Sequence, residues 1–175
     1  DYMSGHLPNS VLVPFNRSFP TTAGSYIRED EKIYLICDPR DLKSIVESLI
    51  RIGLDDIAGY ITPEAINAQH EQGEQLEKIN IVDFKKAETL RSQDEDTEVL
   101  DVRGSSEFEE GHIPGAKNIV HTRLADSLDQ LDKSKSYVVH CRMGGRAAGA
   151  CSFLKRNGYD TTFIDDFIID YLNDE

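Results

Sequence analysis

Short apolar runs alternate with amphipathic stretches along the C-terminal part of the chain. The runs are residues 79–82, 98–102, 137–140 and 161–164. They are rich in β-branched residues and bounded by polar turns, a pattern typical of strands buried in a parallel sheet. Helical patterns lie between them, at 84–90 after the cap residue Asp83, in a short turn through Glu110 capped by Ser105 or Ser106, and at 145–157 before Gly158. Alternation of this kind predicts an α/β fold whose parallel sheet is covered by helices.

Two segments of the chain repeat. Residues 5–11 recur as 111–117, and residues 49–55 recur as 154–160. Two matches in the same order at nearly one spacing indicate two tandem copies of one α/β module. We therefore expect a first module at 1–62, a polar linker at 63–78 and a second module at 79–175.

The first module is predicted to be incomplete. Its pattern gives a strand at 32–37, a helix at 39–52 and a strand at 56–61. The counterpart of the strand at 98–102 would fall before residue 1. We expect the chain to be a fragment of a longer polypeptide, with this copy N-terminally incomplete.

Composition narrows the classes of function. The chain has 175 residues with 19 Lys and Arg against 32 Asp and Glu, a net charge of −13. An acidic surface repels nucleic-acid phosphates and anionic membranes, so neither is an expected partner. The chain lacks an apolar run long enough to span a bilayer and a secretory signal, so we expect a cytoplasmic protein. Its three cysteines, without Cys-x-x-Cys spacing, favour neither a disulfide framework nor a metal site.

A cysteine, two glycines and two arginines lie together in residues 141–146, where a buried strand ends and a helix begins. A thiolate at that position faces the unpaired N–H groups and positive dipole end of the helix. Two glycines allow a tight backbone cradle, and two arginines add positive charge. A structural cysteine would leave these four residues unexplained. We predict Cys141 as a nucleophile, and as substrate-binding residues Arg142, Met143, Gly144, Gly145 and Arg146.

Several separated motifs resemble the rhodanese sulfurtransferase family. They are the loop at 141–146, Asp101-Val102-Arg103, Glu107-Phe108, residues 111–116 and Asn118-Ile119. The resemblance covers about residues 77–165. It implies a five-stranded parallel sheet flanked by helices, with a persulfide sulfur carried on Cys141. The implied donors are thiosulfate or a low-molecular-weight persulfide, and the implied acceptors are a thiol, sulfite or cyanide.

The same resemblance assigns supporting ion pairs to Asp101, Arg103 and Glu107, each of which could also touch the site. The acidic segment 165–175 departs from the family, which usually carries Gly-Gly before an aromatic residue at this point. The resemblance therefore does not assign the residues at the rim of the site.

The first module resembles a rhodanese copy that has lost its site. Cys37 is followed by Asp38 and Asp41, which disfavour a thiolate, and by no glycine that could shape a cradle. Together with residues 19–24, this arrangement resembles the C-terminal part of metallo-β-lactamase-fold/rhodanese fusions of the persulfide dioxygenase–sulfurtransferase type. That resemblance implies a role in sulfide and persulfide detoxification. It also implies an upstream domain with nonhaem iron, and no cofactor in this chain.

Three other residues are expected to be structural. His6 and His112 occupy one repeat position, which favours a role in fixing a turn. Strand neighbours alternate, so His140 should point away from Cys141, and we do not expect it to act as a base. Cys151 lies in the helix after the loop and is expected to be a buried thiol.

Two other functions compete with sulfur transfer. Rhodanese-like folds also include cysteine phosphatases and arsenate reductases, which resemble Cys-x5-Arg, whereas Cys141 and Arg146 form the shorter Cys-x4-Arg. The tighter loop fits a single sulfur atom. A noncatalytic interaction module is the second alternative. The expected partners are small sulfur-containing anions, thiols and the upstream domain, and the sequence leaves a homo-oligomer open.

Overall fold

The computed structural model describes residues 2–71, 73 and 75–173. Residues 1, 72, 74, 174 and 175 fall in the predicted first module, linker and acidic tail and lie outside the described residues. The chain divides into a larger unit, formed by the first twelve residues with residues 77–175, and a smaller unit, Val13–Leu76. No helix in the described part of the chain is both long and apolar enough to cross a membrane.

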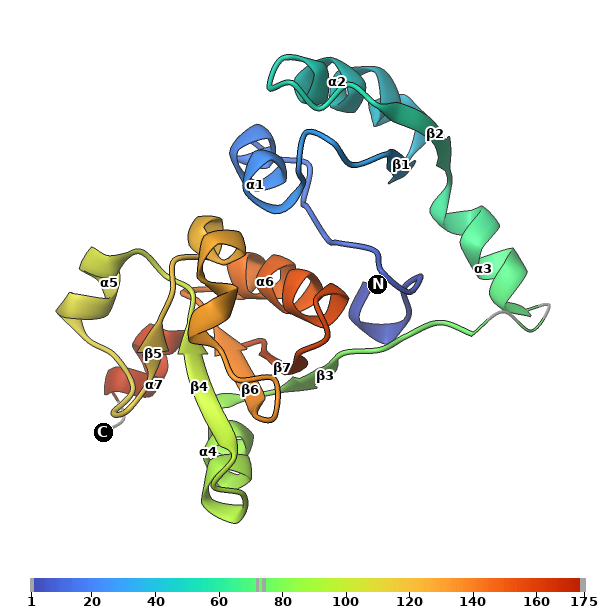
Figure 1. Cartoon of the computed structure of the whole chain (residues 1–175). Helices are drawn as coiled ribbons and strands as arrows, with labels where there is room; N and C mark the ends of the chain where they lie inside the picture. Colours follow the sequence, from blue (N-terminus) through green and yellow to red (C-terminus); the bar gives the residue numbers. More distant parts are fainter. Residues whose placement is uncertain (1, 72, 74, 174–175) are drawn as a thin grey trace. The chain divides into compact units, whose positions relative to one another are not determined.

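The larger unit contains a five-stranded sheet in which every neighbouring pair is parallel. From one edge to the other, its strands are β3 (Asn80–Val82), β7 (Asp160–Ile164), β6 (Ser136–His140), β4 (Thr97–Asp101) and β5 (Lys117–Asn118). Figure 1 shows them with the helices that connect them. This sheet confirms the predicted α/β fold and the five parallel strands that the resemblance implied.

Helices cover both faces of this sheet. They are η1 (Tyr2–Ser4), α4 (Phe84–Gln93), α5 (Ser105–Glu110), η2 (His121–Arg123), η3 (Ala125–Gln130), α6 (Gly145–Arg156) and α7 (Ile168–Asn173). On one face, Phe84 of α4 and Ile168 of α7 join a core cluster with Val99 and Val138. The opposite face is covered by α6, whose side chains from Ala147 to Leu154 are mostly buried. The sheet therefore has a core on each side.

The first residues of the chain pair with the larger unit. His6 and Glu77 exchange two backbone hydrogen bonds of 2.9 Å, and the Leu12 N–H donates to Ser152 Oγ at 2.8 Å. Residues 2–12 thus differ from the predicted boundary, which placed them in one module with residues up to 62. The backbone pairing of His6 with Glu77, a bridge remote in sequence that precedes β3, is the physical reason for the difference.

The repeated Gly-His motif folds alike at both positions. The His6 ring stacks on Tyr2 at 4.2 Å, and the His112 ring stacks on Phe108 at 3.8 Å. Each histidine Nδ1 also lies within hydrogen-bond distance of the carbonyl four residues earlier, at 3.0 and 2.9 Å. These contacts support a turn-fixing role for both histidines.

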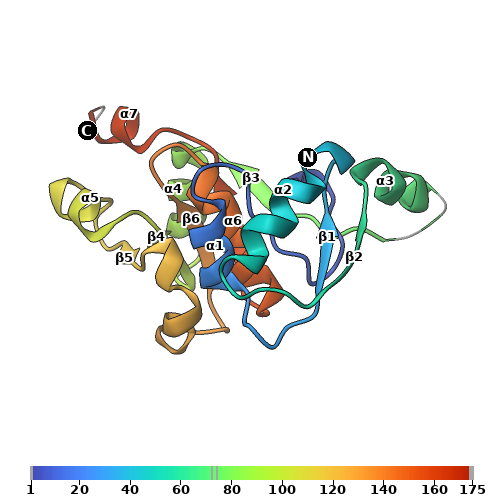
Figure 2. The ribbon, with the colours of Figure 1, turned by 90° about the horizontal axis from the view of Figure 1, so that it is seen from above.

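The smaller unit is a βαβ arrangement with two further helices. Its elements are α1 (Phe19–Tyr26), β1 (Ile33–Ile36), α2 (Pro39–Ile50), β2 (Ile57–Ile61) and α3 (Pro63–Glu71). β1 and β2 form a two-stranded parallel sheet, which Figure 2 shows beside α2. Its core contains Phe19, Ala23, Ile33, Ile45, Leu49 and Leu54. Part of the predicted linker is therefore helical, and the assignment of this unit as a degenerate copy stays a prediction.

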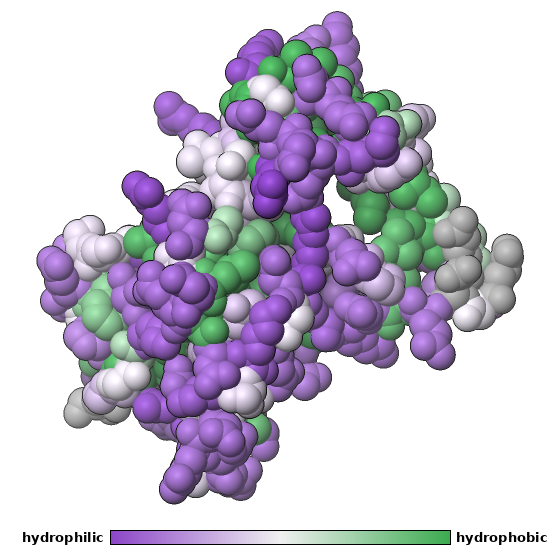
Figure 3. All heavy atoms as spheres, viewed as in Figure 1, coloured by the Kyte–Doolittle hydropathy of each residue, from purple (hydrophilic) through white to green (hydrophobic). Residues whose placement is uncertain are grey.

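Hydrophilic residues dominate the face shown in Figure 3, with apolar residues scattered among them. Charged residues make up 29% of the chain, so a largely polar surface is expected.

Candidate active site

Cys141 follows the central strand β6 directly, four residues before α6 begins at Gly145. Its side chain is buried, with 2% exposure. The N-cap of α6 is Gly144, which has no side chain to occupy the N–H groups of the first turn. The predicted thiol is therefore held at the carboxyl end of a parallel strand, beside an uncapped helix N-terminus.

The cradle depends on one of its two glycines. Gly144 has a φ of +86°, a left-handed value that side chains rarely adopt. A Cβ atom there would lie 2.8 Å from Asp165 Oδ1 and 3.2 Å from the Phe163 ring. A Cβ atom on Gly145 would meet nothing within 4 Å. Of these two positions, only 144 requires glycine, because of both its backbone conformation and the lack of space for a Cβ atom.

Arg146 is held in place by a carboxylate from another element. Its Nη1 and Nη2 donate to Glu107 Oε2 and Oε1 on α5, at 2.6 and 2.8 Å. Glu107 Oε2 also accepts the Gly104 N–H at 3.1 Å. The hydrogen bonds to Glu107 raise the pKa of Arg146, and the nearby Cys141 thiol raises it further. Two parallel bonds fix the plane of the guanidinium as well as its position.

The same pair predicts a pH dependence. Hydrogen bonding to Arg146 holds the pKa of Glu107 at about 2, below its usual 4.5. A lowered carboxyl pKa stabilises the fold above the usual value, and this contribution is lost as the pH falls from 4.5 toward 2. Glu107→Gln should lower the free energy of unfolding by about 1–2 kcal/mol at pH 7. The difference between the two chains should shrink toward pH 3. Urea unfolding across this range measures it, and a constant difference would contradict the assignment.

Asp101 and Arg103 form a separate buried pair beneath the site. Arg103 Nε and Nη2 donate to the Asp101 carboxylate at 2.7–3.0 Å, and both side chains are buried. Arg103 Nη2 also donates to the Gly111 carbonyl at 2.6 Å. The Asn118 amide donates to the carbonyls of Asp101 and Arg103. Of the three predicted supporting residues, Glu107 holds Arg146, whereas Asp101 and Arg103 hold the backbone of the neighbouring strand end.

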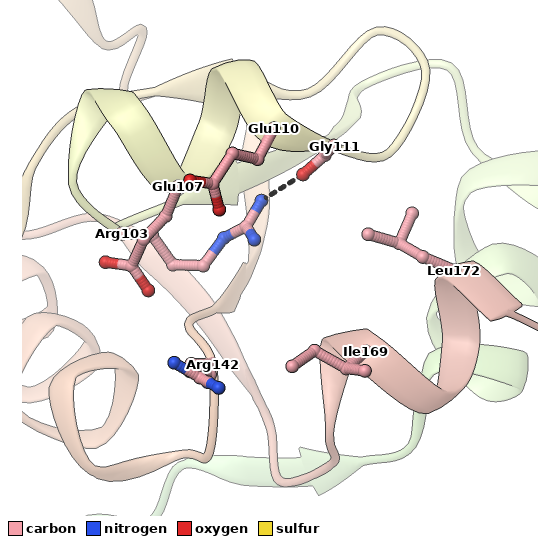
Figure 4. Close-up of a pocket in the computed structure, with 7 residues that line it drawn as sticks. All are labelled: Arg103, Glu107, Glu110, Gly111, Arg142, Ile169 and Leu172. Atoms are coloured by element: carbon pink, nitrogen blue, oxygen red, sulfur yellow. Dashed lines mark hydrogen bonds between the residues drawn. The ribbon is translucent and has the colours of Figure 1, made fainter.

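A pocket of about 240 Å³ opens beside the loop. Its lining comes from the end of β4, from α5, the loop and α7, namely Arg103, Glu107, Glu110, Gly111, Arg142, Ile169 and Leu172 (Figure 4). Arg142 is exposed and forms no ion pair with any carboxylate of the described residues. Because Glu107 engages Arg146, Arg142 is the arginine of the loop left to meet an anion. Met143, also predicted to bind substrate, is 63% exposed.

The other two cysteines have different surroundings. Cys37 lies in the smaller unit, where burial first, and then Asp41 and Asp38, raise the pKa of its thiol. Cys151 is fully buried, and burial likewise raises its thiol pKa. Both environments favour the unreactive protonated form.

Four residues at the site are not predicted by the sequence, namely Glu110, His121, Ile169 and Leu172. Burial and the positive charge of Arg146 lower the pKa of His121, which places this half-buried histidine near the Arg146–Glu107 pair. Ile169 and Leu172 of α7 form a wall of the pocket. Their apolar spacing in an acidic segment was the available signal for α7, whereas nothing local in the sequence marked His121.

Comparisons with known proteins agree with this geometry. Residues 83–166 match the family model described as "Rhodanese-like domain". The chain is 36% identical over 72 residues to "Putative sulfurtransferase YtwF" of Bacillus subtilis, a match that covers 41% of this chain and 70% of that protein. It is 27% identical over 81 residues to a "Sulfurtransferase" of Allochromatium vinosum, with 46% and 76% covered.

A solved structure of a rhodanese-related protein from Thermoplasma volcanium also aligns with the chain. The TM-score is 0.47 at 27% identity, and the alignment covers 54% of this chain and 92% of that one. The family assignment rests on the domain model and on the sequence relative that is matched over 70% of its length. The matched residues include Cys141 and its loop. The chain belongs to the rhodanese family of sulfurtransferase-like proteins.

Proposed function

We propose that this chain transfers sulfane sulfur through a persulfide on Cys141. The observation that carries the proposal is the position of Cys141, directly between the central strand β6 and the uncapped first turn of α6. Free backbone N–H groups and the helix dipole stabilise a negative sulfur at that point. Arg146, fixed by Glu107, adds a cation beside it.

The reaction has two balanced steps. The Cys141 thiolate attacks the outer sulfur of a donor, either thiosulfate or a low-molecular-weight persulfide, and the donor's S–S bond breaks. Sulfite or a thiolate leaves with the electron pair, and Cys141 carries a persulfide anion. A thiol, sulfite or cyanide then attacks the terminal sulfur and releases the Cys141 thiolate. The cradle N–H groups stabilise the negative sulfur in both steps.

The pocket lining carries charges of both signs, with Glu107 and Glu110 beside Arg103 and Arg142. Arg142 lines the pocket without a carboxylate partner among the described residues, so its charge is available to a donor or acceptor. Ile169 and Leu172 supply an apolar wall opposite this charge. Donors that combine a negative group with an organic part would use both surfaces.

Turnover with a donor panel tests the proposal. The chain is incubated with thiosulfate or with glutathione persulfide, and thiocyanate formation from cyanide is followed. We expect turnover with at least one donor and none with Cys141→Ser. Cys151→Ser, which alters a buried thiol of α6 outside residues 141–146, serves as a matched control and should retain turnover. Equal turnover by Cys141→Ser and the unaltered chain would refute the proposal.

The competing functions give different results in the same panel. A cysteine phosphatase would hydrolyse p-nitrophenyl phosphate in a Cys141-dependent way and form no thiocyanate. The interval of four residues between Cys141 and Arg146 favours sulfur over a tetrahedral phosphate. A noncatalytic module would show neither activity.

We also propose a place for this activity in sulfide and persulfide detoxification, downstream of a metallo-β-lactamase-fold domain in the same polypeptide. The sequence repeat and the βαβ arrangement of the smaller unit support this context. No three His, Cys, Asp or Glu side chains within the described ranges are grouped to hold a metal ion. The resemblance to such fusions assigns nonhaem iron to the upstream domain.

A further inference from the structure

His140 is the last residue of β6 and immediately precedes the nucleophile. In the parallel register, its backbone partner is Asp101 on β4, so the two side chains lie on the same face of the sheet. Both are fully buried. The sequence analysis expected this side chain to point away from Cys141 and assigned it no chemistry.

Both ring nitrogens of His140 face oxygen atoms. Nδ1 lies 3.3 Å from the Cys141 carbonyl oxygen, within hydrogen-bond distance. Nε2 lies 3.6 Å from Asp101 Oδ2 and has no hydrogen-bond partner in the described part of the chain. A neutral imidazole has one N–H group, and only the Nδ1–H form makes a hydrogen bond at these distances.

The surroundings keep this ring neutral. Burial lowers the pKa of His140, the Asp101 charge and the bond to the Cys141 carbonyl oppose that effect, and the Arg103 charge adds to it. On the face of the sheet covered by α4, the uncharged Phe84 ring meets the imidazole edge to face, with the ring centroids 5.4 Å apart. The ring is therefore held between an aromatic side chain and the Asp101–Arg103 pair.

A bond to the Cys141 carbonyl has a consequence for the loop. The described residues have no cis peptide bonds, and in a trans peptide the C=O and the following N–H point in opposite directions. A carbonyl tied toward His140 therefore turns the Arg142 N–H to the opposite side. Because successive side chains point to opposite faces of a sheet, we expect the Cys141 side chain on that same opposite side.

We infer that His140 is a positioning residue for the sulfur site: its Nδ1–H fixes the Cys141 carbonyl and thereby aims the Arg142 N–H at the Cys141 sulfur. His140 acts through the peptide group between residues 141 and 142 and exchanges no proton with substrate. Its importance for sulfur transfer rests on the proposed function. The effect of His140 on the reactivity of the Cys141 thiol is independent of that function.

Two isosteric variants test this inference. His140→Asn places an N–H donor near the position of Nδ1, whereas His140→Leu has nearly the same shape and no donor. Both are made with Cys37→Ser, which removes the most exposed of the three thiols and leaves Cys141 and the fully buried Cys151. The alkylation rate is measured from pH 5 to pH 10, with Cys141→Ser reporting any remaining labelling.

His140→Leu should lower the alkylation rate at pH 7 by about three- to tenfold, the effect of one lost hydrogen bond. Its pH profile should also move to higher pH, whereas the Asn variant should stay close to the parent. Equal profiles for Leu and Asn would overturn the inference, as would a lower melting temperature without a shift of the profile. If the Leu variant does not fold, His140→Phe preserves ring packing against Phe84 and carries the same expectation.

Alkylation and sulfur transfer separate the two proposals. A profile shifted in the Leu variant alone supports the positioning role even if the parent transfers no sulfur. That second result would count against the proposed function only. Unshifted profiles in a parent that transfers sulfur would count against His140 only.

Discussion

Asp101→Ala should lower the free energy of unfolding of the larger unit by about 3–5 kcal/mol, because it strands a buried cation. Arg103 is 5% exposed, and its guanidinium donates to both oxygens of a fully buried Asp101. Once the carboxylate is removed, the Gly111 carbonyl is the acceptor that remains for that guanidinium among the described residues. Urea unfolding followed by circular dichroism measures the loss.

Two variants control for this effect. Asp129→Ala removes an exposed carboxylate of η3 that forms no ion pair with the described residues, and it should change stability little. Asp101→Leu combined with Arg103→Met replaces both charges by apolar side chains and should recover part of the loss. A loss below about 1 kcal/mol in Asp101→Ala would indicate that water solvates Arg103.

Gly144→Ala should reduce sulfur transfer by about 100-fold, the order of effect produced when reacting groups are misplaced by about 1 Å. The left-handed backbone alone costs about 1–2 kcal/mol with a side chain present. The new Cβ atom would also crowd Asp165 and the buried Phe163 ring. Relaxing either contact moves the loop that carries Cys141.

Gly145→Ala is the matched control, one residue away in the same loop. It places a methyl group in open space, at the first position of α6. It should leave the fold equally or more stable, since it restricts the unfolded chain. Thermal melts and turnover of both variants measure the contrast, and equal losses in the two variants would contradict the steric account of the cradle.

The sequence predicted the repeating part of the fold well. The predicted strands in the larger unit lie within one residue of β3, β4, β6 and β7. Helix α5 ends at the predicted Glu110, but its cap residue is Gly104 and not Ser105 or Ser106. These elements carry local signals, namely β-branched runs, cap residues and a glycine after α6. Burial on both faces of a parallel sheet produces such runs directly.

Elements without local signals were missed. Helix α1 contains Pro20, two threonines and Gly24, a poor combination for helix formation. It is stabilised by packing of Phe19 and Ala23 against a core that includes Ile45 and Leu49. Tertiary contacts of this kind are not visible in a single sequence.

The candidate site shows the same division. The strand–loop–helix pattern placed Cys141 and its cradle, because all of these residues are contiguous. The partner of Arg146 could not be derived from spacing, since Glu107 lies 39 residues earlier and approaches only when α5 folds over the loop. This pairing has a chemical consequence. Arg146 is held by Glu107, whereas Arg142 has no carboxylate partner among the described residues.

The most direct test of the central claim is the intact mass of the chain after incubation with thiosulfate or glutathione persulfide. Transfer through Cys141 predicts a gain of one sulfur, about 32 Da, that cyanide or sulfite removes and that Cys141→Ser does not acquire. A chain that gains no mass from either donor, or a Cys141→Ser variant that gains it equally, would contradict the account.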